Sequence, residues 1–355
     1  MNESDLALGQ LFLIGFAGLT VDARHPAVAA ISRYDLGGVI LFDRELNGSR
    51  RNIESPGQLR ELTAALQGFA RAPLLIAVDQ EGGRVCRLKE EDGFAPTVPA
   101  KFLGDQDDPV TTRRHAEEMA RELAAFGINL NLAPVVDMDL NPANPIIGRY
   151  LRSFGSGAQR VVSHAGAFID AHHQHNIACC LKHFPGHGSA AGDSHLGFVD
   201  NSDQWRPAEL EPYQQLIAAG LADSLMTAHV VNRQLDPSGL PATLSVPVLG
   251  GLLRDRLGFA GVIISDDLQM RAISDQWSYE EAVTGALLAG VDMLIVCNIL
   301  AQEEDAVGRG VRAVRELLAS GRISERQVRA SLARIALLKQ KIAGTMPWNN
   351  AQPTT

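Results

Sequence analysis

The sequence has few cysteines, few aromatic residues and no long apolar segment. Its 355 residues include four cysteines, and aromatic side chains make up 5% of the chain. No CxxC pair occurs, so we expect no dense disulfide framework. Cys179 and Cys180 stand side by side in an apolar run, which indicates small core residues and reduced thiols in a cytoplasmic protein. No run reaches the roughly 18 to 20 apolar residues that a membrane span requires.

Basic residues are also fewer than acidic residues. The chain has 32 lysines and arginines against 41 aspartates and glutamates, which gives a formal net charge of −9. This balance argues against a general binding surface for nucleic acid or for an anionic membrane. Near the N-terminus, Glu3 and Asp5 precede the apolar residues 11–14, where a signal peptide would carry positive charge. We therefore expect no signal peptide.

What is present is an alternation of two patterns. Eight short apolar runs indicate strands, at residues 10–16, 37–42, 74–79, 130–137, 177–183, 224–230, 261–266 and 293–297. Segments with helical spacing lie between and after them, at residues 25–34, 56–70, 110–126, 159–173, 207–219, 247–257, 279–289, 303–319 and 325–342. Strands that are apolar throughout are typical of a parallel sheet buried on both faces.

The order of these elements predicts an α/β fold, a (β/α)8 TIM-type barrel. An open doubly wound sheet is the alternative, but no GxGxxG fingerprint follows the first strand. No internal repeat or linker divides the chain, so we expect a single barrel domain over residues 1–343. The last residues, 344–355, have the composition of a loose polar tail.

Nearly every expected strand ends in polar residues. Because the catalytic groups of such barrels gather at the carboxyl ends of the strands, this recurrence predicts a catalytic pocket there. The polar residues at or just beyond these ends are Asp79, Gln80, Glu81, Arg84, Arg87, Asp137, Asp139, Lys182, His183, His229, Asp266, Asp267 and Asn298.

The segment KHFPGHGSAAGDSH, residues 182–195, follows the fifth expected strand and carries the densest set of reactive side chains. Asp193 and His195 are two residues apart, so the carboxylate can reach the nearer imidazole nitrogen, set the tautomer and raise the basicity of the ring. Its glycines allow the loop to carry the pair into and out of a substrate pocket. A solvated loop with a capping aspartate is the alternative.

Asp266 ends the seventh expected strand, after residues that are apolar or small. A carboxylate at the mouth of an apolar barrel can attack an electrophilic carbon or bind a cation. Asp266 and Asp267 point to opposite faces of a strand and cannot easily share one ion, so we expect Asp266 to be a nucleophile. Asp267 is expected to cap the next helix or to bond the barrel rim.

Three histidines, His172, His173 and His175, gather near the end of an expected helix. The cluster could suggest zinc, but it precedes the fifth strand and lies away from the expected pocket. We therefore expect a solvated helix terminus there, and we expect no metal site in the chain.

Several motifs taken together resemble glycoside hydrolase family 3. They are DQEGGRV after the third strand, RSFG at residues 152–155, KHFPGHG with DSH, MTAHV at 226–230, PATLS at 241–245 and SDDLQM at 265–270. Within that family the chain is similar to the single-domain bacterial β-N-acetylglucosaminidases of peptidoglycan recycling. The resemblance covers about residues 8 to 300 and contains no counterpart of the second, sandwich-type domain of many relatives.

The resemblance implies a role for each matching residue. Asp266 is expected to be the nucleophile, and Asp193 with His195 the dyad in which histidine is the general acid/base. The residues expected to contact the sugar are Asp79, Arg87, Arg152, Lys182 and His183. The segment GRYLRSFG is longer than the usual spacing between the glycine and RSF, so Arg149 is the alternative to Arg152.

The resemblance also implies an activity. The enzyme would be a retaining exo-β-N-acetylglucosaminidase that releases terminal N-acetylglucosamine from small soluble anhydro-muropeptides, as a monomer and without a metal or organic cofactor. A histidine acid/base adds no negative charge to repel inorganic phosphate, so a phosphorylase is the first alternative. A sugar-binding barrel that has lost catalysis is the second.

Overall fold

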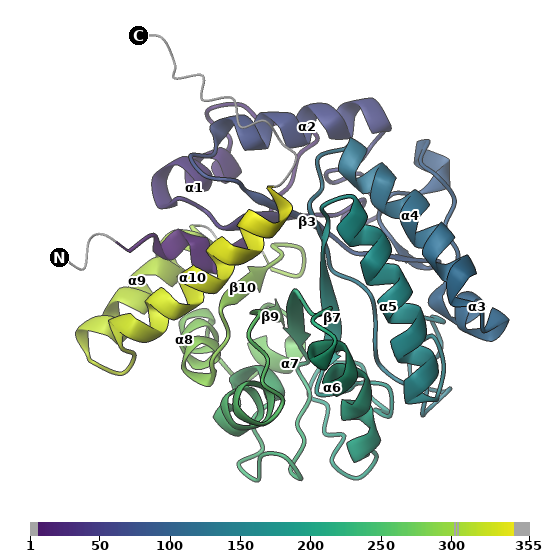
Figure 1. The fold of residues 1–355 in the computed structure, drawn as a ribbon. Coiled ribbons are helices and arrows are strands. Elements are labelled where there is room, and N and C mark those ends of the chain that lie inside the picture. The colour runs from purple at the N-terminus through teal and green to yellow at the C-terminus, as the bar shows by residue number, and fades with distance from the viewer. Residues whose placement is uncertain (1–5, 302, 304, 344–355) are drawn as a thin grey trace.

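The computed structural model describes residues 6–301, 303 and 305–343 as a (β/α)8 barrel (Figure 1). Eight parallel strands close the barrel in the order β1-β10-β9-β8-β7-β6-β3-β2. They are β1 (Phe12–Gly15), β2 (Gly38–Leu41), β3 (Leu75–Val78), β6 (Leu130–Asn131), β7 (Ala178–Phe184), β8 (Ser224–Thr227), β9 (Val262–Asp267) and β10 (Met293–Val296). The predicted fold class is confirmed, whereas the predicted tail at 344–355 lies outside the described residues.

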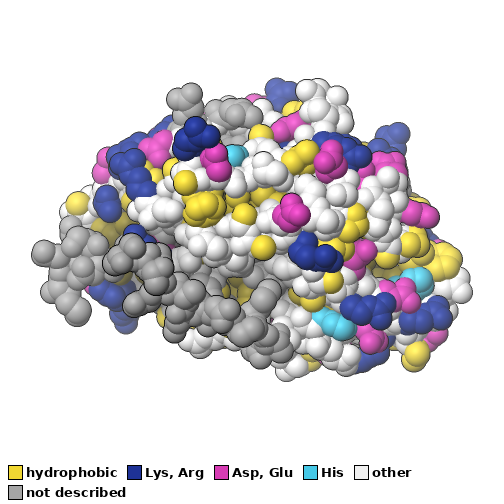
Figure 2. Space-filling view, turned by 90° about the horizontal axis from the view of Figure 1, so that it is seen from above, with side chains coloured by type: hydrophobic (Ala, Val, Ile, Leu, Met, Phe, Trp, Pro, Cys, Tyr) yellow, Lys and Arg dark blue, Asp and Glu magenta, His cyan; other side chains and the backbone are white. Residues whose placement is uncertain are grey.

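Helices surround the strands in Figure 1. They are α1 (Pro26–Tyr34), α2 (Pro56–Phe69), α3 (Ala100–Gln106), α4 (Pro109–Ala125), α5 (Ala158–Gln174), α6 (Glu211–Ala218), α7 (Arg271–Ser274), α8 (Tyr279–Ala289), α9 (Ala306–Ala319) and α10 (Glu325–Ile342). A π-helix, Pro247–Arg256, stands where residues 247–257 were predicted to be helical. Acidic and basic side chains are interspersed on the face of the molecule shown in Figure 2.

The strands are buried because helices cover the outside of the barrel and side chains fill its inside. Every residue of β1, β2, β3, β7, β8 and β10 is buried. This explains why the apolar runs carry no alternation of polar residues. The parallel register places all the carboxyl ends of the strands on one side, where the polar residues that follow them can meet.

The predicted strand at 130–137 is too long. Regular pairing covers only β6, and Val135 then forms a single bridge to Lys182. Pro134 lies between these two points and has no N–H to donate, which interrupts the ladder. Conversely, the antiparallel hairpin of β4 (Gln80–Gly82) and β5 (Val85–Cys86) was not predicted, because its polar sequence lacks a strand pattern.

Helix α10 closes the barrel at the amino ends of the strands, opposite the expected pocket. Its Ser331 and Arg334 bond Asp292, the residue just before β10, at 2.6 and 3.0 Å. Asp292 is fully buried, and it also accepts from Arg254 of the π-helix and, at 2.8 Å, from the backbone N–H of Ile263 in β9. One carboxylate thus joins α10, the π-helix and two strands.

Replacing this carboxylate should destabilise the barrel. Asp292→Ala leaves two arginines without their buried partner, so the free energy of unfolding should fall by about 3–5 kcal/mol. Urea denaturation followed by circular dichroism measures the change. The control, Asp255→Ala, removes an exposed carboxylate from the same region and should shift the midpoint little. Equal shifts in the two variants would contradict a structural role for Asp292.

Candidate active site

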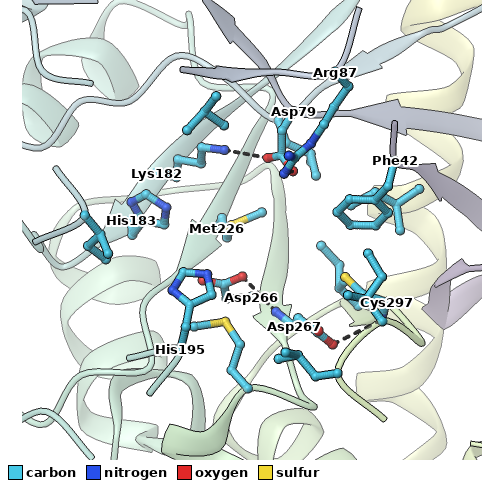
Figure 3. A pocket seen from close by; sticks show the side chains of 18 of the residues that line it. Phe42, Asp79, Arg87, Lys182, His183, His195, Met226, Asp266, Asp267 and Cys297 are labelled. Carbon is cyan, nitrogen blue, oxygen red and sulfur yellow. Dashed lines mark hydrogen bonds and ion pairs between the residues drawn. The ribbon is translucent and has the colours of Figure 1, made fainter. Parts of the chain in front are cut away.

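A cavity of about 490 Å³ opens at the carboxyl ends of the strands (Figure 3). All eight residues that were predicted to form the site line it: Asp79, Arg87, Arg152, Lys182, His183, Asp193, His195 and Asp266. They come from β3 and its hairpin, the loop after β6, β7 and its loop, and β9. Side chains separated by nearly two hundred residues therefore meet in one hollow, as the barrel arrangement predicts.

Asp266 lies in this cavity in its charged form. Burial disfavours the carboxylate, but the surrounding imidazoles, including those of His229 and His183, outweigh burial and hold the pKa of Asp266 below its usual range. The backbone N–H of Asp267 also donates to its Oδ1 at 2.8 Å. In Figure 3 the carboxylate lies beside the His195 ring. An ionised carboxylate in such a place can act as a nucleophile.

Asp267 behaves differently from its neighbour. Its Oδ1 accepts from the backbone N–H groups of Gln269 and Cys297, both at 3.1 Å, which confirms the predicted bonding of the barrel rim. Burial raises the pKa of Asp267 to about 6. His229 is also buried and bonds the carbonyl of Asp267 at 2.9 Å. The two adjacent carboxyl groups are thus separated in pKa, with that of Asp266 lowered and that of Asp267 raised.

Asp193 and His195 form the predicted pair. Asp193 Oδ1 accepts from the backbone N–H of His195 at 2.9 Å and lies 2.8 Å from its Nδ1. Burial disfavours the imidazolium, but the hydrogen bond to Asp193 and the charge of Asp266 outweigh burial, so the pKa of His195 is raised. The His195 side chain is 51% exposed. Its other nitrogen is therefore free to exchange a proton with a molecule in the cavity.

The loop that carries Asp193 and His195 is held in place by hydrogen bonds of Ser194, the residue between them. The backbone carbonyl of Ser194 accepts a hydrogen bond from the backbone N–H of Ala272 at 3.2 Å. The hydroxyl of Ser194 lies 3.4 Å from Nε2 of the buried His187. These contacts hold the backbone between Asp193 and His195, while both flanking side chains face the cavity.

Buried ion pairs form the opposite wall of the cavity. Lys182 Nζ lies 2.7 Å from both Asp79 and Glu81, Arg87 lies 3.2 Å from Asp79, and Arg152 lies 2.7 Å from Glu81. Burial disfavours the carboxylates, but the adjacent cations outweigh it and lower the pKa of both acids. The wall therefore presents fixed hydrogen-bond donors and acceptors to the cavity.

The role of Glu81 was not predicted from the sequence. Its two carboxylate oxygens accept hydrogen bonds from Nε and Nη2 of Arg152, each at 2.7 Å. Arg152 therefore lines the cavity as an oriented, buried group, whereas Arg149 is exposed and is absent from the lining. The structure places Arg152, the preferred of the two arginines, in the pocket. Pairing between residues 71 positions apart leaves no local signal that could have revealed Glu81.

His183 is held by a residue of the β6–α5 loop. Asp137 Oδ2 lies 2.7 Å from Nδ1 of His183 and accepts from its backbone N–H at 3.1 Å. Nε2 lies 3.3 Å from Nη2 of Arg152, which can only donate. The imidazole of His183 is thus fixed between Asp137 and Arg152 at the edge of the cavity.

The predicted solvated helix terminus at the histidine cluster is wrong for His172. Its ring is fully buried, lies 3.0 Å from Asn131 of β6, and stacks on Phe168. Burial lowers the pKa of His172 to about 4. His173 instead pairs with Asp223 at 2.7 Å. Among the residues that the structure describes, no group of three or more His, Cys, Asp or Glu side chains could hold a metal ion.

A carboxylate and a histidine–aspartate pair share a polar hollow at the mouth of a (β/α)8 barrel, which is where the enzymes of this fold carry their active sites. A model of the Glycosyl hydrolase family 3 N terminal domain matches residues 4–338. The chain therefore belongs to glycoside hydrolase family 3.

Individual relatives agree with this assignment. The beta-hexosaminidase of Tolumonas auensis is 41% identical over 282 residues, which are 78% of this chain and 77% of that protein. Beta-hexosaminidase A of Pseudoalteromonas piscicida is 34% identical over 88% of this chain, but the match spans only 54% of that longer protein. A solved family 3 beta-N-acetylglucosaminidase from Paenibacillus sp. str. FPU-7 has a TM-score of 0.85 and 35% identity, covering 98% of this chain and 65% of its own.

Within residues 6–301, 303 and 305–343, no helix is both long and apolar enough to cross a bilayer.

The Asp193–His195 pair can be tested without a substrate. In Asp193→Asn the amide can still bond the ring but carries no negative charge, so the pKa of His195 should fall. An NMR titration of the imidazole signals measures this directly. Asp203→Asn, an exposed change beyond the same loop, is the control and should leave the titration of His195 unaltered. An unchanged or higher pKa in Asp193→Asn would contradict the coupling.

Proposed function

We propose that the protein is a retaining exo-β-N-acetylglucosaminidase that releases terminal β-1,4-linked N-acetylglucosamine from anhydro-muropeptides. The observation that carries the proposal is the meeting of Asp266, His195 and Asp193 in one cavity. The names of the relatives support the choice of sugar, because they are beta-hexosaminidases and a beta-N-acetylglucosaminidase.

In the first step, Asp266 attacks the anomeric carbon of the terminal sugar. The bond to the leaving oxygen breaks as the bond to the carboxylate forms, which gives a covalent glycosyl-aspartate. His195 donates its proton to the leaving oxygen, so that a neutral alcohol departs. The raised pKa of His195 favours the imidazolium that this step needs, and the lowered pKa of Asp266 favours the attacking anion.

In the second step, water replaces the leaving group. His195, now neutral, accepts a proton from the water as the water attacks the anomeric carbon, and Asp266 is released as the carboxylate. Asp193 holds the ring through both steps and balances the charge of the imidazolium. Two inversions at the same carbon restore the original β configuration.

The opposite wall binds the sugar in this proposal. Asp79 and Lys182, joined by their ion pair, offer an acceptor and a donor for neighbouring hydroxyls. Arg87, Arg152 and His183 complete the set of contacts. A bound cofactor is not needed, since all protons and electron pairs of the two steps are accounted for by Asp266, His195 and water.

The substrates fit a small, enclosed site. A cavity of about 490 Å³ accommodates a terminal sugar and part of its neighbour, and the chain has few aromatic residues for a long stacking platform. This supports small soluble peptidoglycan fragments as partners. We therefore place the activity in cytoplasmic cell-wall recycling, where it would contribute to cell-wall biogenesis, cell shape and cell division, and we propose a monomer that binds neither nucleic acid nor membrane.

Phosphorolysis is the second candidate. The acid/base position holds an imidazole, which does not repel an anion as a glutamate would. In that case inorganic phosphate replaces water in the second step and the product is a sugar 1-phosphate.

Product analysis distinguishes these activities. Purified protein and a GlcNAc–1,6-anhydro-MurNAc disaccharide should give free N-acetylglucosamine, formed first as the β anomer, and the rate should not depend on phosphate. NMR spectroscopy records the anomer and mass spectrometry the products. Sugar 1-phosphate that forms only with phosphate would establish the phosphorylase instead. A first-formed α anomer would overturn the retaining mechanism, and an uncleaved disaccharide would overturn the proposed substrate.

A further inference from the structure

Arg84 and Tyr150 form a pair at the mouth of the cavity that the two catalytic steps do not use. Both residues line the cavity, and the guanidinium carbon of Arg84 lies 3.9 Å from the centre of the Tyr150 ring. This distance is that of a stacked cation–π contact. Arg84 is exposed, whereas the Lys182 side chain at the sugar-binding wall is only 2% exposed. The pair therefore lies nearer to solvent than that wall.

The fold brings this pair together through the buried ion pair of Glu81 and Arg152. Glu81 belongs to β4, and Arg84 stands at the tip of the same hairpin. The tip is tightly fixed, because a Cβ on Gly82 would lie 2.3 Å from a backbone oxygen. Tyr150 stands two residues before Arg152. The stack is thus built on two segments whose relative position is already set.

Tyr150 belongs to the segment GRYLRSFG, residues 148–155. The backbone there is wound into a turn, with Leu151 donating to the carbonyl of Gly148 at 3.0 Å and adopting a φ of 58°. The carbonyl of Leu151 also accepts from the backbone N–H of Lys101 in α3 at 3.1 Å. This turn places the Tyr150 ring under Arg84.

Arg84 differs from the other cations of the cavity in having no acidic partner. The remaining lysine and arginine side chains that line it are ion-paired, namely Arg44, Arg87, Arg152 and Lys182. Among the described residues, no hydrogen bond or ion pair engages the Arg84 guanidinium. Its stacking on Tyr150 uses one face and leaves the N–H groups at its edge unoccupied.

We propose that the Arg84–Tyr150 pair binds a carboxylate on the leaving-group sugar and so selects acidic substrates. An exo-acting site encloses the terminal sugar, so the leaving group extends toward the mouth, where Arg84 lies. A planar guanidinium matches a carboxylate with two parallel hydrogen bonds, and the tyrosine ring fixes its plane. This inference rests on the proposed function, and it assigns the preference for an acidic leaving group to two residues outside the catalytic set.

The test compares one disaccharide in two forms. GlcNAc–1,6-anhydro-MurNAc carries a carboxylate on its lactyl group, and its methyl ester is the neutral match. For the unaltered protein, kcat/KM should be about 10- to 100-fold higher for the acid than for the ester, as expected for a charge-assisted bidentate contact. In Arg84→Gln this preference should disappear through loss of activity on the acid, while activity on the ester stays close to its original value.

Three further variants test the roles of the two residues. Arg149→Gln removes an exposed arginine from the neighbouring segment, and the preference should survive in it. Tyr150→Leu should reduce the preference, whereas Tyr150→Phe should keep it because the ring remains. A preference that persists in Arg84→Gln, or equal losses on acid and ester, would overturn the inference. Equal cleavage of both forms by the unaltered protein would also overturn it and leave the proposed function standing, whereas cleavage of neither would reject the proposed function itself.

Discussion

A continuous series of ion pairs, running Arg87–Asp79–Lys182–Glu81–Arg152, fixes the geometry of the cavity wall that we propose binds the sugar. Buried charges are costly unless each is paired, and here every charge has a partner of opposite sign. These ion pairs connect β3, its hairpin, the loop before α5, and β7. The wall therefore cannot form until these elements have packed. Binding groups that are already oriented lose little freedom when a substrate arrives.

The side of the cavity that contains Asp266, Asp267 and His195 is not built from paired charges of this kind. Its two adjacent acids are separated by their surroundings, since hydrogen bonds and nearby imidazoles favour the anion of Asp266 while burial raises the pKa of Asp267 to about 6. His195 stands on a loop with half of its side chain exposed, in contrast to the buried wall opposite. A wall of buried ion pairs and an accessible imidazole thus share one hollow.

The barrel could be predicted from the sequence because buried parallel strands are apolar throughout, and each ends where polar residues begin. The pair Asp193–His195 could be predicted because its two members are neighbours in sequence. Glu81 could not, since its partners are distant in the chain and its own strand is polar. The burial of His172 was missed for the same reason, because its partner Asn131 comes from another element. Local patterns therefore predict elements and short-range pairs, while contacts between elements need the fold.

In the proposed mechanism, the carboxylate of Asp266 forms the covalent bond to the sugar. The most direct measurement is the turnover of an aryl β-N-acetylglucosaminide by Asp266→Ala, with circular dichroism and thermal unfolding to verify that the barrel is intact. Loss of a nucleophile should lower kcat by about 10⁴-fold or more, without a matching loss of structure. A folded Asp266→Ala protein that turns over the substrate at a rate close to the original would contradict the account.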